Sequence, residues 1–199
     1  MQASRFFWLM TGITLVLLFF LITSGCVENS GLDSEWDEVR ASKESHRSSL
    51  NNYLLVYTIG IDLWNIELDS DTPNTRILRT QIMREETFLM DVAGKHLLLS
   101  SDVTLFSEAA NSLDGRDGEA ATAIAWDLRL YDQEMWNAQN AFIGRLSSLT
   151  RYIEEVEAGR GESREAIAYL ESGNTLSQDA ASAISRADAA FARAEAHHT

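Results

Sequence analysis

The chain has 199 residues, of which 45% are apolar, so it can form one domain with a hydrophobic core but not two large ones. Its 16 Lys and Arg face 30 Asp and Glu, and the net charge of −14 argues against nucleic acid, whose phosphates attract clustered cations. A single cysteine and a single proline exclude an internal disulfide framework, a multi-cysteine metal motif and a proline-rich chain.

Residues 1–25 have the pattern of a signal peptide or a membrane anchor. Arg5 is followed by an apolar, uncharged stretch over residues 6–22 and then by small residues that precede Cys26. This order describes a secretory signal, and the stretch through Gly25 is also long enough to cross a bilayer as a helix. Acidic residues follow from Glu28 onward, so the positive-inside rule predicts that the rest of the chain lies outside the cytoplasm, on a cell membrane.

The tetrapeptide Thr23-Ser24-Gly25-Cys26 resembles the lipobox of prokaryotic lipoproteins at its two small positions and its cysteine. Thr23 stands where that family usually has Leu, Val or Ile. The resemblance covers the leader alone, and it implies a lipid on Cys26 and cleavage before it. Two alternatives remain, an uncleaved signal anchor and an ordinary cleaved secreted protein. We expect residues 26–33 to form a short tether.

Residues 34–199 are predicted to form four helices. Turn-rich stretches at 69–73, 114–118 and 159–161 divide this part into segments of about 34–70, 73–113, 119–158 and 162–197. Each segment carries apolar residues at alternating steps of three and four, which is the stripe of an amphipathic helix. Thr72 before Pro73 suggests an N-cap for the second helix, Asp117 or Gly118 a start for the third, and Ser163 a start for the fourth.

Four helices of similar length joined by short turns predict an all-α fold, an up-down-up-down antiparallel four-helix bundle behind the N-terminal signal or anchor helix. The bundle would be about 55 Å long. Residues 53–61, YLLVYTIGI, also alternate like a strand. In the fourth segment, residues 172–175 predict a kink or short break near Gly173, with Thr175 capping a restarted helix.

Two polar residues, Glu85 and His96, lie on the apolar stripe of the second segment. If the turn between the second and third helices centres near residues 115–116, Glu85 faces the level of Arg145. We predict that Glu85 and Arg145 form a buried pair that fixes the helix register, since an unpaired buried carboxylate is costly. The alternatives are that both side chains extend to solvent at the bundle edge, or that this polar layer is a ligand site. The same count places His96 near Met135, Trp136 and Arg47.

The residues that usually carry chemistry form no recognisable catalytic or cofactor motif. A nucleophile elbow, a phosphate loop and a dinucleotide fingerprint are all absent from the sequence. Of the four histidines, only His198 has a Glu three residues earlier, at the end of the chain, so we expect no metal in the bundle, and His197 and His198 are expected to be solvated. The acidic pairs Glu85-Glu86 and Glu154-Glu155 point in different directions on a helix. We therefore expect no enzyme and no cofactor.

The aromatic residues complete the expectations about function. Trp64 lies on the stripe and is expected in the core, whereas Trp126 and Trp136 lie off it and could mark an interface. The leading hypothesis is a membrane-tethered interaction or structural module with a protein partner. The alternative is an extracytoplasmic module that binds a small ligand, in an accessory or sensory role.

Overall fold

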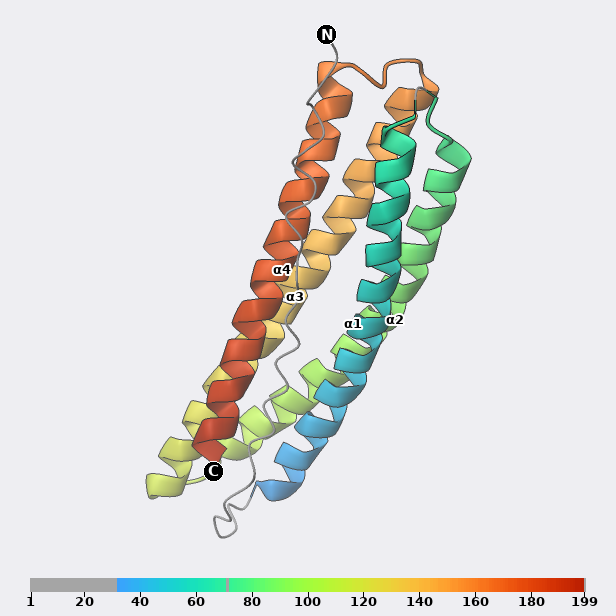
Figure 1. Ribbon diagram of the computed structural model, residues 1–199. Coiled ribbons are helices and arrows are strands. Elements are labelled where there is room, and N and C mark those ends of the chain that lie inside the picture. Colours follow the sequence, from blue (N-terminus) through green and yellow to red (C-terminus); the bar gives the residue numbers. More distant parts are fainter. Residues whose placement is uncertain (1–31, 71, 199) are drawn as a thin grey trace.

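The computed structural model describes residues 32–70 and 72–198, and these residues form four long helices (Figure 1). The helices are α1 (Asp33–Leu68), α2 (Thr75–Ala110), α3 (Gly115–Glu157) and α4 (Arg164–His198). The prediction of an all-helical fold is confirmed, since no strand occurs in the described part and residues 53–61 lie within α1. The predicted leader, the lipobox residues and residues 26–31 of the tether lie outside the described residues.

Consecutive helices run in opposite directions and form a helical bundle (Figure 1). Side-chain pairs join residues at matching heights along neighbouring helices: Ser42 of α1 donates to Asp102 of α2, and Arg79 of α2 lies 2.7 Å from Glu157 of α3. On α3 and α4, Glu134 and Arg186 are 2.8 Å apart. The connections α1–α2 and α3–α4 lie at one end of the bundle, and the start of α1 and the end of α4 lie at the other.

The helix starts agree with the sequence in one case and differ in two. Ser163 caps α4 as expected, because its Oγ accepts a hydrogen bond from the backbone of Ala166 at 3.1 Å. The cap of α2 is Asn74 rather than Thr72, because Asn74 accepts from the backbone of Ile77. Helix α3 begins at Gly115, before the predicted Asp117 or Gly118. Gly115 has φ +70°, a conformation that glycine adopts without strain.

The predicted break near Gly173 is wrong, since α4 continues without interruption from Arg164 to His198. The hydroxyl groups that suggested a new cap instead bond within the helix. Thr175 donates to the carbonyl of Glu171 and Ser177 to that of Gly173, each at 3.0 Å. These bonds to the preceding turn are compatible with a continuous helix. Gly173 is buried and packs against Leu149 of α3.

The core changes character across the bundle. Large aromatic side chains fill the space between α1 and its neighbours: the rings of Tyr53 and Phe142 are 4.7 Å apart, and Trp36 stacks on Phe191 at 5.8 Å. Trp64 is buried, as predicted. The α3–α4 pair makes the most extensive close backbone contact, and α4 supplies small buried residues to it (Ala180, Ala183, Ala187, Ala190 and Ala194). None of the four described helices is apolar enough over a sufficient length to span a bilayer.

Candidate functional site

Glu85 and Arg145, the polar residues singled out in the sequence, meet in the core between α2 and α3. Arg145 Nη1 donates to Glu85 Oε2 at 2.5 Å, and the side chains are only 5% and 0% exposed. Neither head group therefore extends to solvent at the bundle edge. The structure brings together the two residues that the register count placed at one level.

The Glu85–Arg145 pair is completed by groups from α1 and α2 that the sequence did not predict. Gln81 donates to Glu85 Oε1 at 3.2 Å and to the carbonyl oxygen of Val56 at 3.0 Å. The Arg145 guanidinium lies 4.6 Å from the centre of the Tyr57 ring, in cation–π geometry. A Cβ on Gly60 would lie 2.5 Å from Glu85 Oε1, so only glycine leaves room for the carboxylate against α1.

Burial dominates the electrostatics of this layer. It raises the pKa of Glu85 despite the opposing effect of Arg145 and the hydrogen bond from Gln81. Burial also raises the pKa of the nearby Tyr53 well above its usual value, and the charge of Glu85 acts in the same direction. An ion pair whose carboxylate is this strongly desolvated contributes little net stability but is costly to break from one side.

A second polar layer surrounds His96, closer to the end of the bundle that holds Asp33. His96 Nε2 lies 2.9 Å from Asp132 Oδ1, and Nδ1 lies 3.2 Å from Gln139 Oε1. Burial lowers the pKa of His96, but the hydrogen bonds to Asp132 and Gln139 outweigh it and the net shift is upward. The predicted neighbour Trp136 is present, with its ring 5.8 Å from that of His96.

The α1 residue beside His96 is His46 rather than the expected Arg47. The two imidazole rings are 5.3 Å apart, and neither nitrogen of the buried His46 ring has a hydrogen-bond partner among the described residues. Burial, the neighbouring His96 and Arg47 lower the pKa of His46 to about 4. Arg47 itself points to α4, where it donates to Asp188 at 2.9 Å. The layer thus pairs a neutral imidazole with one that favours its proton.

The outer face of α2 carries large apolar side chains that the described residues leave uncovered. Met83, Met90 and Leu97 are 67%, 75% and 68% exposed, and they are spaced seven residues apart, so they share one face of the helix. On α3, Trp136 and Ile143 are about half exposed at the same spacing. We call these five residues the outer strip. Trp126, also exposed, lies elsewhere on α3.

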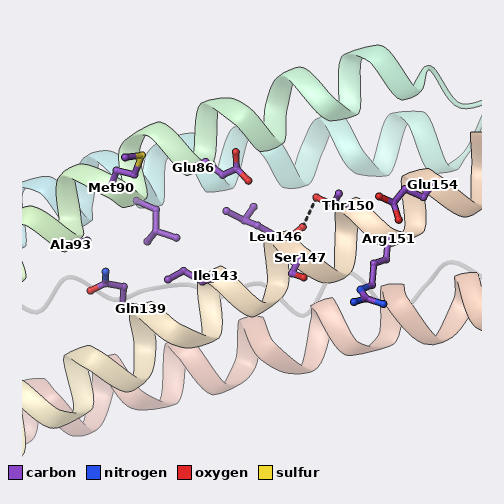
Figure 2. A pocket seen from close by; sticks show the side chains of 11 residues that line it. Glu86, Met90, Ala93, Gln139, Ile143, Leu146, Ser147, Thr150, Arg151 and Glu154 are labelled. Carbon is purple, nitrogen blue, oxygen red and sulfur yellow. Dashed lines mark hydrogen bonds between the residues drawn. The ribbon is translucent and has the colours of Figure 1, made fainter.

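A groove of about 780 Å³ runs between α2 and α3 beside the outer strip (Figure 2). Its apolar lining comes from Leu89, Met90 and Ala93 of α2 and from Ile143 and Leu146 of α3. Polar side chains line the groove along its length, from Gln139 at one end, past Glu86, to Glu154 at the other (Figure 2). A groove with this mixed lining suits an amphipathic partner.

The two histidines near the end of the chain, His197 and His198, lie in different surroundings. His198 is not solvated as expected, because its ring stacks on Trp36 with the centroids 4.5 Å apart. His197 is half exposed, 3.7 Å from Asp127. In the described part of the chain, no group of three or more His, Cys, Asp or Glu side chains could hold a metal ion.

The sequence signals for the second polar layer were weak. Asp132 and Gln139 lie just off the apolar stripe of α3, and their positions in the sequence resemble those of ordinary surface residues. The outer strip had a readable signal in its seven-residue spacing. Comparison with known protein families, with curated proteins and with solved structures found no match for this chain.

Proposed function

We propose that this protein is a membrane-tethered, extracytoplasmic lipoprotein whose up-down-up-down helical bundle acts as an interaction or structural module. The observation that carries the proposal is the outer strip, a row of exposed apolar side chains beside the α2–α3 groove. Large exposed apolar patches on soluble domains usually mark interaction sites. The lipobox-like Cys26 supports the tether.

The distribution of charge agrees with an interaction role. The chain has a net charge of −14, yet Met83, Met90 and Leu97 interrupt its surface with an uncharged row. Depletion of charge and enrichment in Met and aromatic residues are typical of the centres of protein interfaces. The Glu85–Arg145 pair lies behind this row, buried in the core.

The tether is tested by the intact mass of protein extracted from membranes. We expect the loss of residues 1–25 and an added lipid mass, and Cys26→Ser should abolish both. A full-length, unmodified mass contradicts the lipoprotein and leaves the uncleaved signal anchor. If the protein is cleaved, carries no lipid and is released from the membrane, both the lipid tether and the signal anchor are contradicted.

The interaction is tested by placing a photo-crosslinking amino acid at Met90 in the full chain, in its own membranes. A matched control places it at Ser182, which is exposed on α4. We expect a discrete adduct at position 90 and none at position 182. If neither position gives an adduct, or both give the same smear, the outer strip is not an interaction surface.

A second candidate, a small-ligand module, is favoured by the α2–α3 groove and by the unpartnered ring nitrogens of His46. A ligand that binds the native state raises the melting temperature by mass action. Screening amphiphilic small molecules by thermal shift tests this candidate. A hit is assigned to the groove if Ala93→Trp, which fills it, removes the shift while a similar change on α4 does not.

A further inference from the structure

The residues of the outer strip on α2 are spaced symmetrically about Met90, and this symmetry favours one kind of binding partner. Met83 and Leu97 lie seven residues on either side of Met90, at two helical turns in each direction, and all three side chains are highly exposed. A row of this kind reads the same in both chain directions. It therefore matches itself when a second helix lies against it with reversed polarity.

Three ion pairs show which residues of α3 share a height with α2. Arg79 pairs with Glu157, Glu85 with Arg145, and His96 with Asp132.

Interpolation between the last two pairs places residue 139 of α3 near the height of Met90, so Trp136 and Ile143 lie at similar distances on opposite sides of Met90.

We propose that the occupant of the outer strip is a second copy of this chain, related by a two-fold axis that is perpendicular to the helices and passes near Met90. Met90 then meets Met90 of the second copy, Met83 meets Leu97, and Trp136 lies near Ile143. The proposal rests on the proposed function, since it names the partner of the same surface. A self-complementary contact of this kind closes after two copies.

The charges beside the strip favour this antiparallel arrangement. Reversal brings Arg84 within reach of Asp91 of the second copy, and this contact occurs twice. A parallel arrangement that places groove against groove instead brings Glu86 toward its own counterpart. Opposite charges select the first arrangement, and like charges penalise the second.

The experiment uses single cysteines in the full chain, co-expressed as two differently tagged copies and treated in membranes with a short thiol crosslinker. Met90→Cys should give a dimer of the two tags. Met83→Cys alone should not, because its two copies lie about 21 Å apart along the axis. A mixture of Met83→Cys and Leu97→Cys should crosslink. The unmodified chain controls for Cys26, and Ser182→Cys controls for random collision.

Each other result has a definite meaning. Crosslinking by Met83→Cys alone shows a parallel pair and overturns the proposal. Failure of Met90→Cys and of the Met83/Leu97 mixture overturns self-association. If the photo-crosslinker at Met90 nevertheless gives an adduct with another protein, the interaction module survives and the second-copy inference fails. If that probe gives no adduct either, both fail.

A charge exchange tests the orientation without relying on thiol chemistry. Arg84→Glu places two acids at the Arg84–Asp91 contact and should lower the yield of the Met90→Cys dimer about three- to tenfold. Adding Asp91→Arg restores opposite charges and should restore the yield. If the exchange does not rescue the yield, these residues do not face each other. Circular dichroism of both variants checks that the exposed substitutions leave the helices intact.

Discussion

Helices α2 and α4 have similar lengths and occupy the same bundle, yet they divide their residues between core and surface in opposite ways. Helix α4 buries alanines together with Ile184 and Phe191, and Ile167 is its only large apolar residue among the strongly exposed ones. Helix α2 buries Glu85 and His96 while it exposes Met83, Met90, Leu97, Leu98 and Leu105.

This difference indicates that α4 and α2 have different roles in the bundle. The small residues of α4 let its backbone approach α3 closely, which maximises dispersion contacts and suits a helix whose task is packing. The polar groups inside α2 require specific partners on α1 and α3, which suits a helix whose position must be defined. Its outer apolar residues add nothing to the described core and remain available for binding.

The largest effect is expected from removing one side of the α2 polar layer. Arg145→Ala leaves the Glu85 carboxylate unpaired in the core and should cost about 3–5 kcal/mol of unfolding free energy at neutral pH. A double-mutant cycle with Glu85→Ala, measured by urea unfolding, should give a coupling well above about 1 kcal/mol, the upper range for exposed pairs. Additive effects contradict a role for the pair in fixing the register.

The same variant should recover stability in acid. Burial already raises the pKa of Glu85, so the stability associated with its neutral form is present below the unfolded-state pKa and is lost as pH rises through the folded-state pKa. Removing Arg145 takes away the positive charge that opposes this shift, so the pKa of Glu85 rises further. The difference in unfolding free energy between Arg145→Ala and the parent chain should therefore become smaller toward pH 4. A difference that does not change with pH indicates that the Glu85 carboxylate does not cause the loss of stability.

In α4 the sensitive feature is size rather than charge. Ala187→Leu inserts three carbon atoms into the tight α3–α4 contact and should cost up to about 3 kcal/mol through overpacking. The matched control is Ala189→Leu, exposed on the same helix, which should change the unfolding free energy by less than about 0.5 kcal/mol. Equal losses in the two variants mean that α4 does not depend on close packing.

An intermediate effect is expected from His46. Its folded-state pKa is depressed to about 4, so the stability it contributes is present above its unfolded-state pKa and is lost as pH falls toward 4. This amounts to about 2 kcal/mol between pH 7 and pH 5. His96 and Glu85 shift upward and act in the opposite direction, while Asp132 and Arg47 complete the local charges.

The contribution of His46 is therefore measured as the difference between two profiles of stability against pH, one for the parent chain and one for a His46 variant. His46→Leu cannot gain a proton and should remove the loss between pH 7 and pH 5 when the urea midpoint is followed. If the two profiles remain parallel, the titration of His46 does not control acid stability.

The smallest effect on folding is expected at the outer strip. Met90→Gln in dilute protein should change the unfolding free energy by less than about 0.5 kcal/mol, because the side chain is three-quarters exposed. A loss of several kcal/mol at a concentration where the chain is monomeric means that Met90 belongs to a core, and the contrast between α2 and α4 then disappears.

Helix identity and the Glu85–Arg145 level could be read from the sequence because both depend on regular spacing. The count that placed Arg145 opposite Glu85 used only the position of one turn. The cap at Asn74 and the continuity of α4 could not be read, because Thr72, Thr175 and Asn74 all have side chains able to cap. Which of them does so depends on the path of the chain and on contacts with other helices.

Trp136 was singled out from the sequence, but the α2 residues of the outer strip were missed because two stripes overlap in α2. Ile82 and Leu89 face the core, and Met83 and Met90 follow them directly with the same spacing. Hydrophobicity alone cannot show which stripe is buried, since that depends on the side from which α1 and α3 pack. His46 was missed for a related reason, because its core position became meaningful only when His96 was found beside it.

The stacking of Trp36 on His198 brings the start of α1 and the end of α4 together at one end of the bundle, so the proposed tether would join the bundle there (Figure 1). Met90 lies 20 residues from Ala110 at that end, which is about 30 Å along α2. In the proposed antiparallel pair, the starts of the two α1 helices, where the proposed tethers would attach, therefore lie about 60 Å apart at opposite ends. Two copies standing on facing surfaces would hold those surfaces at that spacing, whereas two copies on one surface must lie flat.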